Sequence, residues 1–260
     1  MRAQSRGLRA RAHRPWPLPE RPWLMGQTWE DLLFAHWRVP AAALERVVPE
    51  ALRPVDVHDG SAWLGLTPFV VRALRLHGTP PAPRESHFPE VNVRTYVTVG
   101  GRPGIHFLSL DAARRLAVHA ARRGYRLPYF HAEMHVERAG RDVRYRSRRR
   151  SGDGEPAELL GVYRPDGPVF QARPGSLEWF LTERYCLYTL DPAGNVLRAE
   201  IHHPPWPLQA AAAEFEVNTM ARPFGVDLTG EPLLHFAARQ DVVIWRTRRI
   251  DALDTTPVRR

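Results

Sequence analysis

Alternation of apolar and polar residues along the chain predicts a protein built mainly from strands. Within residues 90–99 the odd positions are almost all valine, as expected where every second side chain of a strand faces a packed layer. The same period places four polar side chains on the opposite face of this strand: Glu90, Asn92, Arg94 and Tyr96. A second alternating strand covers 129–137. The pattern therefore indicates strands with one apolar and one polar face.

Other segments extend this pattern. Strands are expected over 32–39, 62–71, 105–111, 184–190 and 196–202, with a last strand pair over 233–245, and turn residues separate several of them. Short helices are expected over 41–48, 112–123 and 177–182, the last one capped by Ser176. Many strands and few helices predict a mainly β (β-rich α+β) fold, in which curved antiparallel sheets form a barrel.

The chain is expected to contain one domain. Residues 1–22 are rich in arginine and proline and predict a partly disordered N-terminal extension. Residues 23–250 carry the strand pattern without an internal repeat or linker, and residues 251–260 are expected to form a C-terminal tail. No apolar run is long enough for a membrane span, so no membrane partner is expected.

Composition changes the picture at one point, because all 37 basic residues are arginine and lysine is absent from the 260 residues. Side-chain Schiff-base chemistry and a Walker-type phosphate loop are thereby excluded.

The formal net charge of +9 suggests nucleic acid as a partner. However, the arginines gather in two places, the N-terminal extension and residues 141–150. The extension lacks the interleaved aromatic residues of single-strand binders, and a charged strand end that faces water explains the second cluster. We therefore do not expect a nucleic-acid partner, and keep a non-catalytic nucleic-acid-associated protein as an alternative.

Cys186 is the single cysteine, which excludes a disulfide framework and a cysteine-rich zinc site. This usage agrees with a cytoplasmic location. A buried, inert thiol is the favoured interpretation of Cys186, and no cofactor is expected.

His131, Glu133 and His135 occupy alternate positions of one expected strand, so neighbouring members lie about 6.6 Å apart on one face. Such residues can bind a metal, and a metalloenzyme built on them is a further alternative. A strand edge that faces solvent is the favoured interpretation, since zinc sites need additional ligands in a fixed geometry.

The polar face formed by Glu90, Asn92, Arg94 and Tyr96 is a stronger candidate for a site. A carboxyl group, an amide, a guanidinium and a phenol together suit an organic acid, whose carboxylate Arg94 would bind through two hydrogen bonds. A buried pair of Arg94 and Glu90 that joins neighbouring strands explains the same residues equally well.

Several motifs carry a resemblance to a known family. They are Leu33-Phe34-Ala35-His36-Trp37, Asn92-Val93-Arg94-Thr95-Tyr96-Val97, the segment from Pro103 to Asp111, Phe180-Leu181-Thr182-Glu183-Arg184-Tyr185, and Ile201-His202-His203-Pro204-Pro205-Trp206. Together, from about Trp23 to Trp245, they resemble the YqjF-like family of uncharacterised bacterial proteins, which is similar in fold to acetoacetate decarboxylase. This resemblance implies an antiparallel barrel with a central pocket.

The superfamily's signature enzyme uses a lysine imine, and this chain offers no amine for it. The corresponding segment, 104–111, contains His106, Ser109 and Asp111 instead, and Arg184 and His202 stand in two of the other motifs. We add these five residues to the candidate pocket. The sequence thus predicts a barrel that binds a small, anionic organic molecule, with a lyase- or hydrolase-type reaction left open. Its oligomeric state is also left open.

Overall fold

A computed structural model describes residues 3–81, 86–150 and 152–250 of the chain, and the expected C-terminal tail lies outside these residues. The order of elements is α1 (Ala3–Gly7), β1 (Met25–Val39), α2 (Ala41–Glu45), η1 (Glu50–Leu52), β2 (Val57–His58), β3 (Ser61–Leu76), β4 (Phe88–Val99), β5 (Arg102–Ala112), α3 (Arg115–Tyr125), β6 (Tyr129–Ala139), β7 (Asp142–Arg149), β8 (Glu158–Pro165), α4 (Leu177–Thr182), β9 (Cys186–Leu190), β10 (Val196–His202), β11 (Gln209–Asn218), η2 (Arg222–Phe224), β12 (Leu233–Ile244) and β13 (Arg248–Arg249). The expected mainly β class is confirmed.

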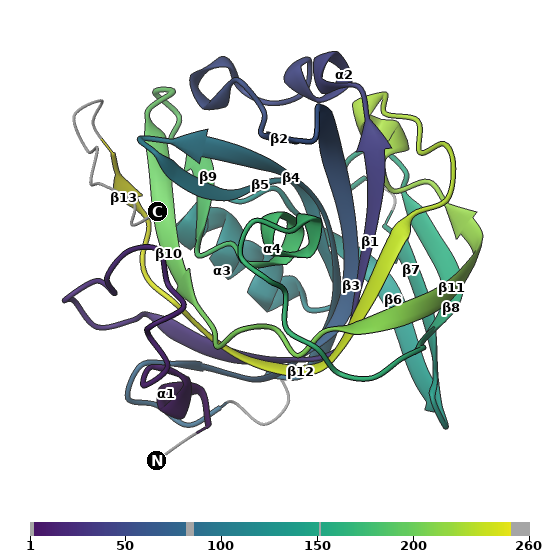
Figure 1. Cartoon of the computed structure of the whole chain (residues 1–260), viewed down its shortest axis with the longest axis horizontal. Helices are drawn as coiled ribbons and strands as arrows, with labels where there is room; N and C mark the ends of the chain where they lie inside the picture. Colours follow the sequence, from purple (N-terminus) through teal and green to yellow (C-terminus); the bar gives the residue numbers. More distant parts are fainter. Residues whose placement is uncertain (1–2, 82–85, 151, 251–260) are drawn as a thin grey trace.

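The strands close into a ring (Figure 1). Strands β1, β3, β4, β5, β9, β10 and β12 are linked pair by pair, and the ladder between β10 and β12 completes the circle. Closure removes the exposed edges that a sheet of this length would otherwise have. Most pairings are antiparallel, as expected, but β5 pairs in parallel with both β6 and β9.

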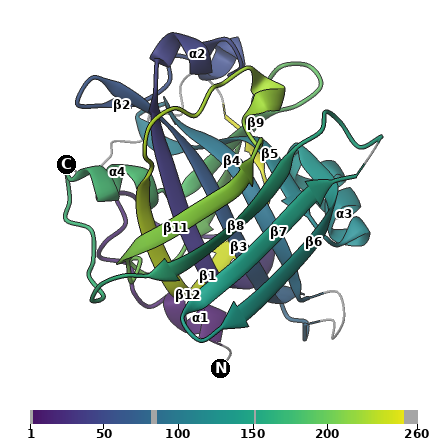
Figure 2. The same ribbon diagram turned by 90° about the vertical axis from the view of Figure 1, so that its right-hand side faces the viewer.

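A second layer, made of β6, β7, β8 and β11, lies against one side of this ring (Figure 2). Its end strands, β6 and β11, pair with β5 and β12 of the ring. One face of the wall from β12 through β1, β3 and β4 to β5 therefore packs against this layer, and the other face points to the interior of the ring. Val91 and Val93 of β4 pack with Tyr145 of β7 and Tyr163 of β8. The polar face of β4 therefore points into the ring rather than to water.

Two helices stand at opposite ends of the ring. The main-chain oxygen of Leu181 in α4 accepts a hydrogen bond from the Tyr96 hydroxyl at 2.9 Å, which places α4 at the Tyr96 end of β4. Tyr125 of α3 and Glu90 line the same cavity, so α3 lies at the other end of that strand. Ser176 caps α4 as expected, with its hydroxyl accepting a hydrogen bond from the Trp179 amide at 3.3 Å.

Some element boundaries differ from the expectation. Residues 233–244 form one long strand rather than a strand pair, because β12 pairs with β1 along almost its whole length. Helix α3 begins at Arg115 rather than at residue 112, since residues up to Ala112 continue β5.

The described part of the N-terminal segment, 3–22, lies against the barrel. Arg14 is buried and forms an ion pair with Glu200 at 3.0 Å, while the Trp16 indole donates a hydrogen bond to the same carboxylate at 2.7 Å. Gln4 in α1 is also buried. The positive charge of Arg14 is thus neutralised inside the protein instead of being displayed to a polyanion.

Candidate functional site

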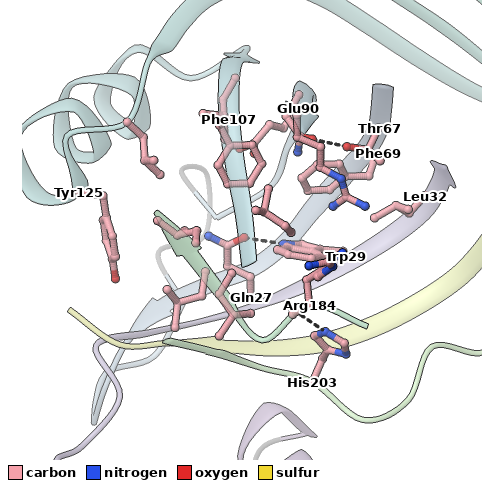
Figure 3. A pocket seen from close by; sticks show the side chains of 18 of the residues that line it. Gln27, Trp29, Leu32, Thr67, Phe69, Glu90, Phe107, Tyr125, Arg184 and His203 are labelled. Carbon is pink, nitrogen blue, oxygen red and sulfur yellow. Dashed lines mark hydrogen bonds between the residues drawn. The ribbon is translucent and has the colours of Figure 1, made fainter. Parts of the chain in front are cut away.

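A cavity lies inside the ring, and each of the ring's seven strands contributes to its wall (Figure 3). It leaves about 60 Å³ for the centres of water-sized molecules. One water needs about 10–15 Å³ on this scale, so the cavity holds roughly four to six such groups. Much of the wall is apolar, with Phe107 from β5, Leu187 from β9 and Ile201 from β10. The space therefore suits a small organic molecule.

The polar part of the wall comes from β4. Glu90, Asn92 and Arg94 all line the cavity, as the period of two predicts. Glu90 and Arg94 stand four residues apart, or about 13 Å along the strand. The structure does not bring them together as a buried ion pair, because Arg94 is not among the ion-pair partners of any described carboxylate. The cavity thus has a carboxyl end and a guanidinium end.

Glu90 carries the carboxyl group at the α3 end. Its side chain is buried, and burial raises its pKa to about 8, with the nearby Asp111 acting in the same direction. The Tyr129 hydroxyl donates a hydrogen bond to the carboxyl oxygens at 3.2 and 3.3 Å and partly offsets this rise of the pKa. At neutral pH Glu90 is therefore mostly protonated and uncharged, which is the state a general acid needs.

Arg94 carries the positive charge near α4. Its residue is 6% exposed, and its Nη2 donates one hydrogen bond to the Leu181 carbonyl at 3.3 Å. Its Nε is buried and has no hydrogen-bond partner within the described residues, and the guanidinium stands 5.2 Å from the ring centre of Phe34. A buried cation with no carboxylate beside it costs folding free energy, and a bound anion would offset that cost.

Arg184 and His203 complete the guanidinium end (Figure 3). Arg184 donates a hydrogen bond to the Asp56 carboxylate at 2.8 Å, so its charge is already balanced by a protein group. Burial lowers the pKa of His203 to about 3, and its ring is therefore neutral. Arg94 is consequently the cation at this end whose charge no described carboxylate balances.

Asn92 lies between the two ends. Its side-chain oxygen accepts a hydrogen bond from the Thr67 hydroxyl on the paired strand β3. Gly65, opposite Arg94 in the same ladder, makes room for this arrangement, since a Cβ there would stand 3.3 Å from the Arg94 side chain and 3.0 Å from His36. The local sequence of β3 thus supports the polar row on β4.

A bulge in β5 turns two predicted residues away from the cavity. Val93 pairs with Ser109 and Arg94 with Phe107, so Leu108 is an extra residue that shifts the alternation. Phe107 and Leu110 therefore face the cavity, while Ser109 and Asp111 face the second layer. Asp111 is fully buried there and accepts two hydrogen bonds from Arg149, at 2.8 and 2.9 Å. Neither Ser109 nor Asp111 lines the cavity, contrary to the expectation.

Three other predicted residues also lie outside the cavity wall. His106 alternates with Ile105 and Phe107, and its Nδ1 lies 3.2 Å from the Tyr188 carbonyl oxygen. His202 follows the cavity-lining Ile201 and points outward, where its Nε2 is 2.9 Å from the Gly7 carbonyl oxygen. Tyr96 is at the end of the row, where its hydroxyl lies 2.7 Å from His36 Nε2 and bonds to α4.

The metal hypothesis gains no support from the geometry. Among the described residues, no group of three or more histidine, cysteine, aspartate or glutamate side chains is placed to hold a metal ion. Glu133 instead forms an exposed ion pair with Arg150 at 3.1 Å, beside the strand positions of His131 and His135. Cys186 is fully buried, and burial raises the pKa of its thiol to about 12, as expected for an inert cysteine.

Several residues of the wall were not predicted. Gln27 and Trp29 on β1 are hydrogen-bonded to each other at 2.6 Å, and Thr67, Tyr125, Tyr129 and His203 also line the space. Of these residues, only His203 could have been predicted from the sequence. It stands two residues after Ile201, so the strand period places both side chains on the same face. Tyr125 and Tyr129 reach the cavity through the placement of α3, which the strand pattern does not reveal.

The ring, the second layer and the enclosed cavity define a barrel of the acetoacetate decarboxylase type. One similar structure is an acetoacetate decarboxylase from Legionella pneumophila, which covers 92% of this chain and 93% of its own at a TM-score of 0.57 and 10% identity. Another is described as the enduracididine biosynthesis enzyme MppR complexed with pyruvate, covering 90% and 93% at a TM-score of 0.61 and 12% identity. At such identities the likeness shows the fold alone.

The chain belongs to the DUF2071 family, described as "Uncharacterized conserved protein (COG2071)", whose model matches residues 26–241. It is also 44% identical over 233 residues to "Uncharacterized protein YqjF" of Bacillus subtilis (strain 168), covering 89% of this chain and 95% of that protein. The resemblance to YqjF-like proteins is thereby confirmed. Within the described residues, no helix is long and apolar enough to cross a membrane.

Proposed function

We propose that this protein binds a small organic carboxylate in the central cavity, with Arg94 as the group that binds the anion. The observation that carries the proposal is a buried guanidinium at the cavity wall that is balanced by no described carboxylate. A carboxylate would accept two parallel hydrogen bonds from it and restore charge balance. The size of the cavity and the pyruvate bound to a protein of the same fold both support a ligand of a few non-hydrogen atoms.

Glu90 supports a catalytic role in addition to binding. Its carboxyl group titrates near pH 8 and can therefore give or take a proton under ordinary conditions. Because the chain contains no lysine, an imine with a side-chain amine cannot form. A lyase- or hydrolase-type reaction in this cavity would have to run through acid–base groups, and Glu90 is the residue we propose for proton transfer.

Calorimetric titration with acetate, pyruvate and butyrate tests the binding proposal. Arg94→Gln removes the charge and is expected to weaken binding at least tenfold, since charge-assisted hydrogen bonds are about twice as strong as neutral ones. Arg144→Gln, at an exposed arginine of β7, is the matched control and should bind like the natural protein. Unchanged affinity of Arg94→Gln, or no binding of any of these anions by the natural protein, would overturn the proposal.

A second variant covers the case in which Arg94→Gln fails to fold. Asn92→Asp keeps the oxygen that accepts the Thr67 hydrogen bond but adds a negative charge beside Arg94. This variant should exclude carboxylates because the protein itself then supplies the anion.

The role of Glu90 is tested by following NMR spectra of the same ligands over time. Turnover that is lost in Glu90→Gln while binding persists supports acid–base catalysis.

A further inference from the structure

A groove on the surface of the barrel lies beside the cavity. It lies between α3 and the ends of β1, β3 and β4, and leaves about 420 Å³ for water-sized molecules. Six residues line both the groove and the cavity: Met25, Gln27, Glu90, Ala121, Tyr125 and Tyr129. The two spaces are therefore neighbours that share one wall, and this shared wall includes Glu90.

The groove is lined mainly by apolar groups. Leu74 and Leu76 of β3 and Phe88 of β4 form one side, and Leu76 is 56% exposed although it is a large apolar residue. Ala117 and Ala120 of α3 form the other side, and their small side chains leave the groove open. Such a surface gains free energy when an apolar group covers it.

Polar groups stand where the groove meets the cavity. Tyr125 is 5% exposed, and its buried hydroxyl has no hydrogen-bond partner in the part of the chain that the structure describes. Further inside, the Arg94 Nε is also buried and has no hydrogen-bond partner among the described residues. From the groove to the cavity, the wall groups are therefore mainly apolar at first, then include a neutral hydroxyl and the Glu90 carboxyl group, and end at a cation. A ligand that matches this path is apolar at one end and anionic at the other.

We infer that the ligand is a carboxylate with a linear alkyl chain, whose carboxylate lies at Arg94 and whose chain passes Glu90 into the groove. This inference rests on the proposed function, because it takes the carboxylate position from it. A chain is favoured over a bulky group because the cavity itself holds only roughly four to six water-sized groups. On this inference butyrate lies within the cavity, and the added methylenes of a longer acid extend past Glu90 toward the groove.

Affinity measured against chain length tests this inference. Kd is determined by calorimetry for butyrate, hexanoate and octanoate, below the concentrations at which octanoate aggregates. Each methylene buried in the groove should tighten binding about fourfold, so octanoate, with four more methylenes, should bind about 250-fold more tightly than butyrate. 1-Octanol has a chain of the same length without the carboxylate, and it should bind much more weakly than octanoate.

A matched pair of variants on α3 locates the chain. Ala120→Trp fills the groove at an exposed position, and should remove the advantage of octanoate while leaving the affinity for butyrate unchanged. Leu116→Trp places the same side chain on α3 at a residue that is 67% exposed and does not line the groove. It should bind both acids like the natural protein.

The outcomes separate this inference from the proposed function. If butyrate and octanoate bind equally, or if octanoate keeps its advantage in Ala120→Trp, the groove does not hold the chain and the inference fails alone. If no carboxylate binds the natural protein, the proposed function fails and the inference fails with it. Octanoate binding that survives in Arg94→Gln would show attachment elsewhere on the surface, and would also overturn the inference.

Discussion

Replacing Glu90 by glutamine should stabilise the protein, and more so as the pH rises. A glutamine side chain has the shape of a protonated glutamic acid and cannot ionise. In the unfolded chain Glu90 ionises near its ordinary pKa of 4.5, whereas in the folded protein its pKa is about 8. Between these values the folded state retains a proton that the unfolded state has released, and the natural protein therefore loses stability as the pH rises.

The size of the effect follows from this difference in pKa. Each pH unit between 4.5 and 8 lowers the free energy of unfolding of the natural protein by about 1.4 kcal/mol. Relative to its value at pH 4.5, the advantage of Glu90→Gln should grow by about 3 kcal/mol at pH 7 and by about 4 kcal/mol at pH 8, and it levels off above pH 8. Such a change is a large fraction of the stability of an ordinary domain.

Urea unfolding of both proteins at half-unit steps from pH 4.5 to 8.5 measures this dependence. Buried acids that do not interact with Glu90, such as Glu183, are present in both proteins and cancel in the difference. Glu231→Gln, at an exposed residue of a loop, is the matched control and should show a flat difference. A flat curve for Glu90→Gln would mean that Glu90 ionises normally. A destabilised variant at pH 7 would mean that Glu90 is a charged partner, and either result refutes the reasoning.

Three further predictions concern packing and reactivity. Asp111→Asn should lower the free energy of unfolding by about 3–5 kcal/mol, because Arg149 is left buried without its partner; a loss under 1 kcal/mol in urea unfolding would contradict this. Gly104→Ala should cost about 1–3 kcal/mol or more, since its Cβ would lie 2.9 Å from the Cys186 carbonyl oxygen and 2.5 Å from the Tyr188 ring, and an unchanged melting temperature would disprove it. Cys186 should not react with a thiol reagent at pH 8 until the protein is unfolded, because burial raises its pKa to about 12; rapid reaction of the native protein would show that the thiol is accessible.

How far the site could be predicted depended on the regularity of each strand. In β4 the alternation is unbroken, and Glu90, Asn92 and Arg94 were correctly expected to share one face. In β5 the extra residue at Leu108 reverses the alternation, so residues that share a face in an ideal strand lie on opposite faces here. No turn residue or glycine marks this bulge in the sequence.

Two histidines at the end of β10, His202 and the following His203, show a second limit. His202 and His203 are neighbours and must face opposite ways, and the sequence alone does not say which one faces inward. The closure of β10 on β12 decides this, because Ile201 pairs with Ile244 and both line the cavity. The outward His202 then meets the N-terminal segment at Gly7.

By itself the sequence determined the mainly β class, the strand that carries the polar row, and the exclusion of lysine chemistry. These conclusions depend on local periodicity and on composition, which need no knowledge of distant contacts. Only the tertiary structure decided that both faces of β4 are covered, that no carboxylate of the described residues balances Arg94, and that burial keeps Glu90 protonated. Those properties arise from strands far apart in the chain, since solvent exclusion and charge balance at one residue depend on everything packed around it.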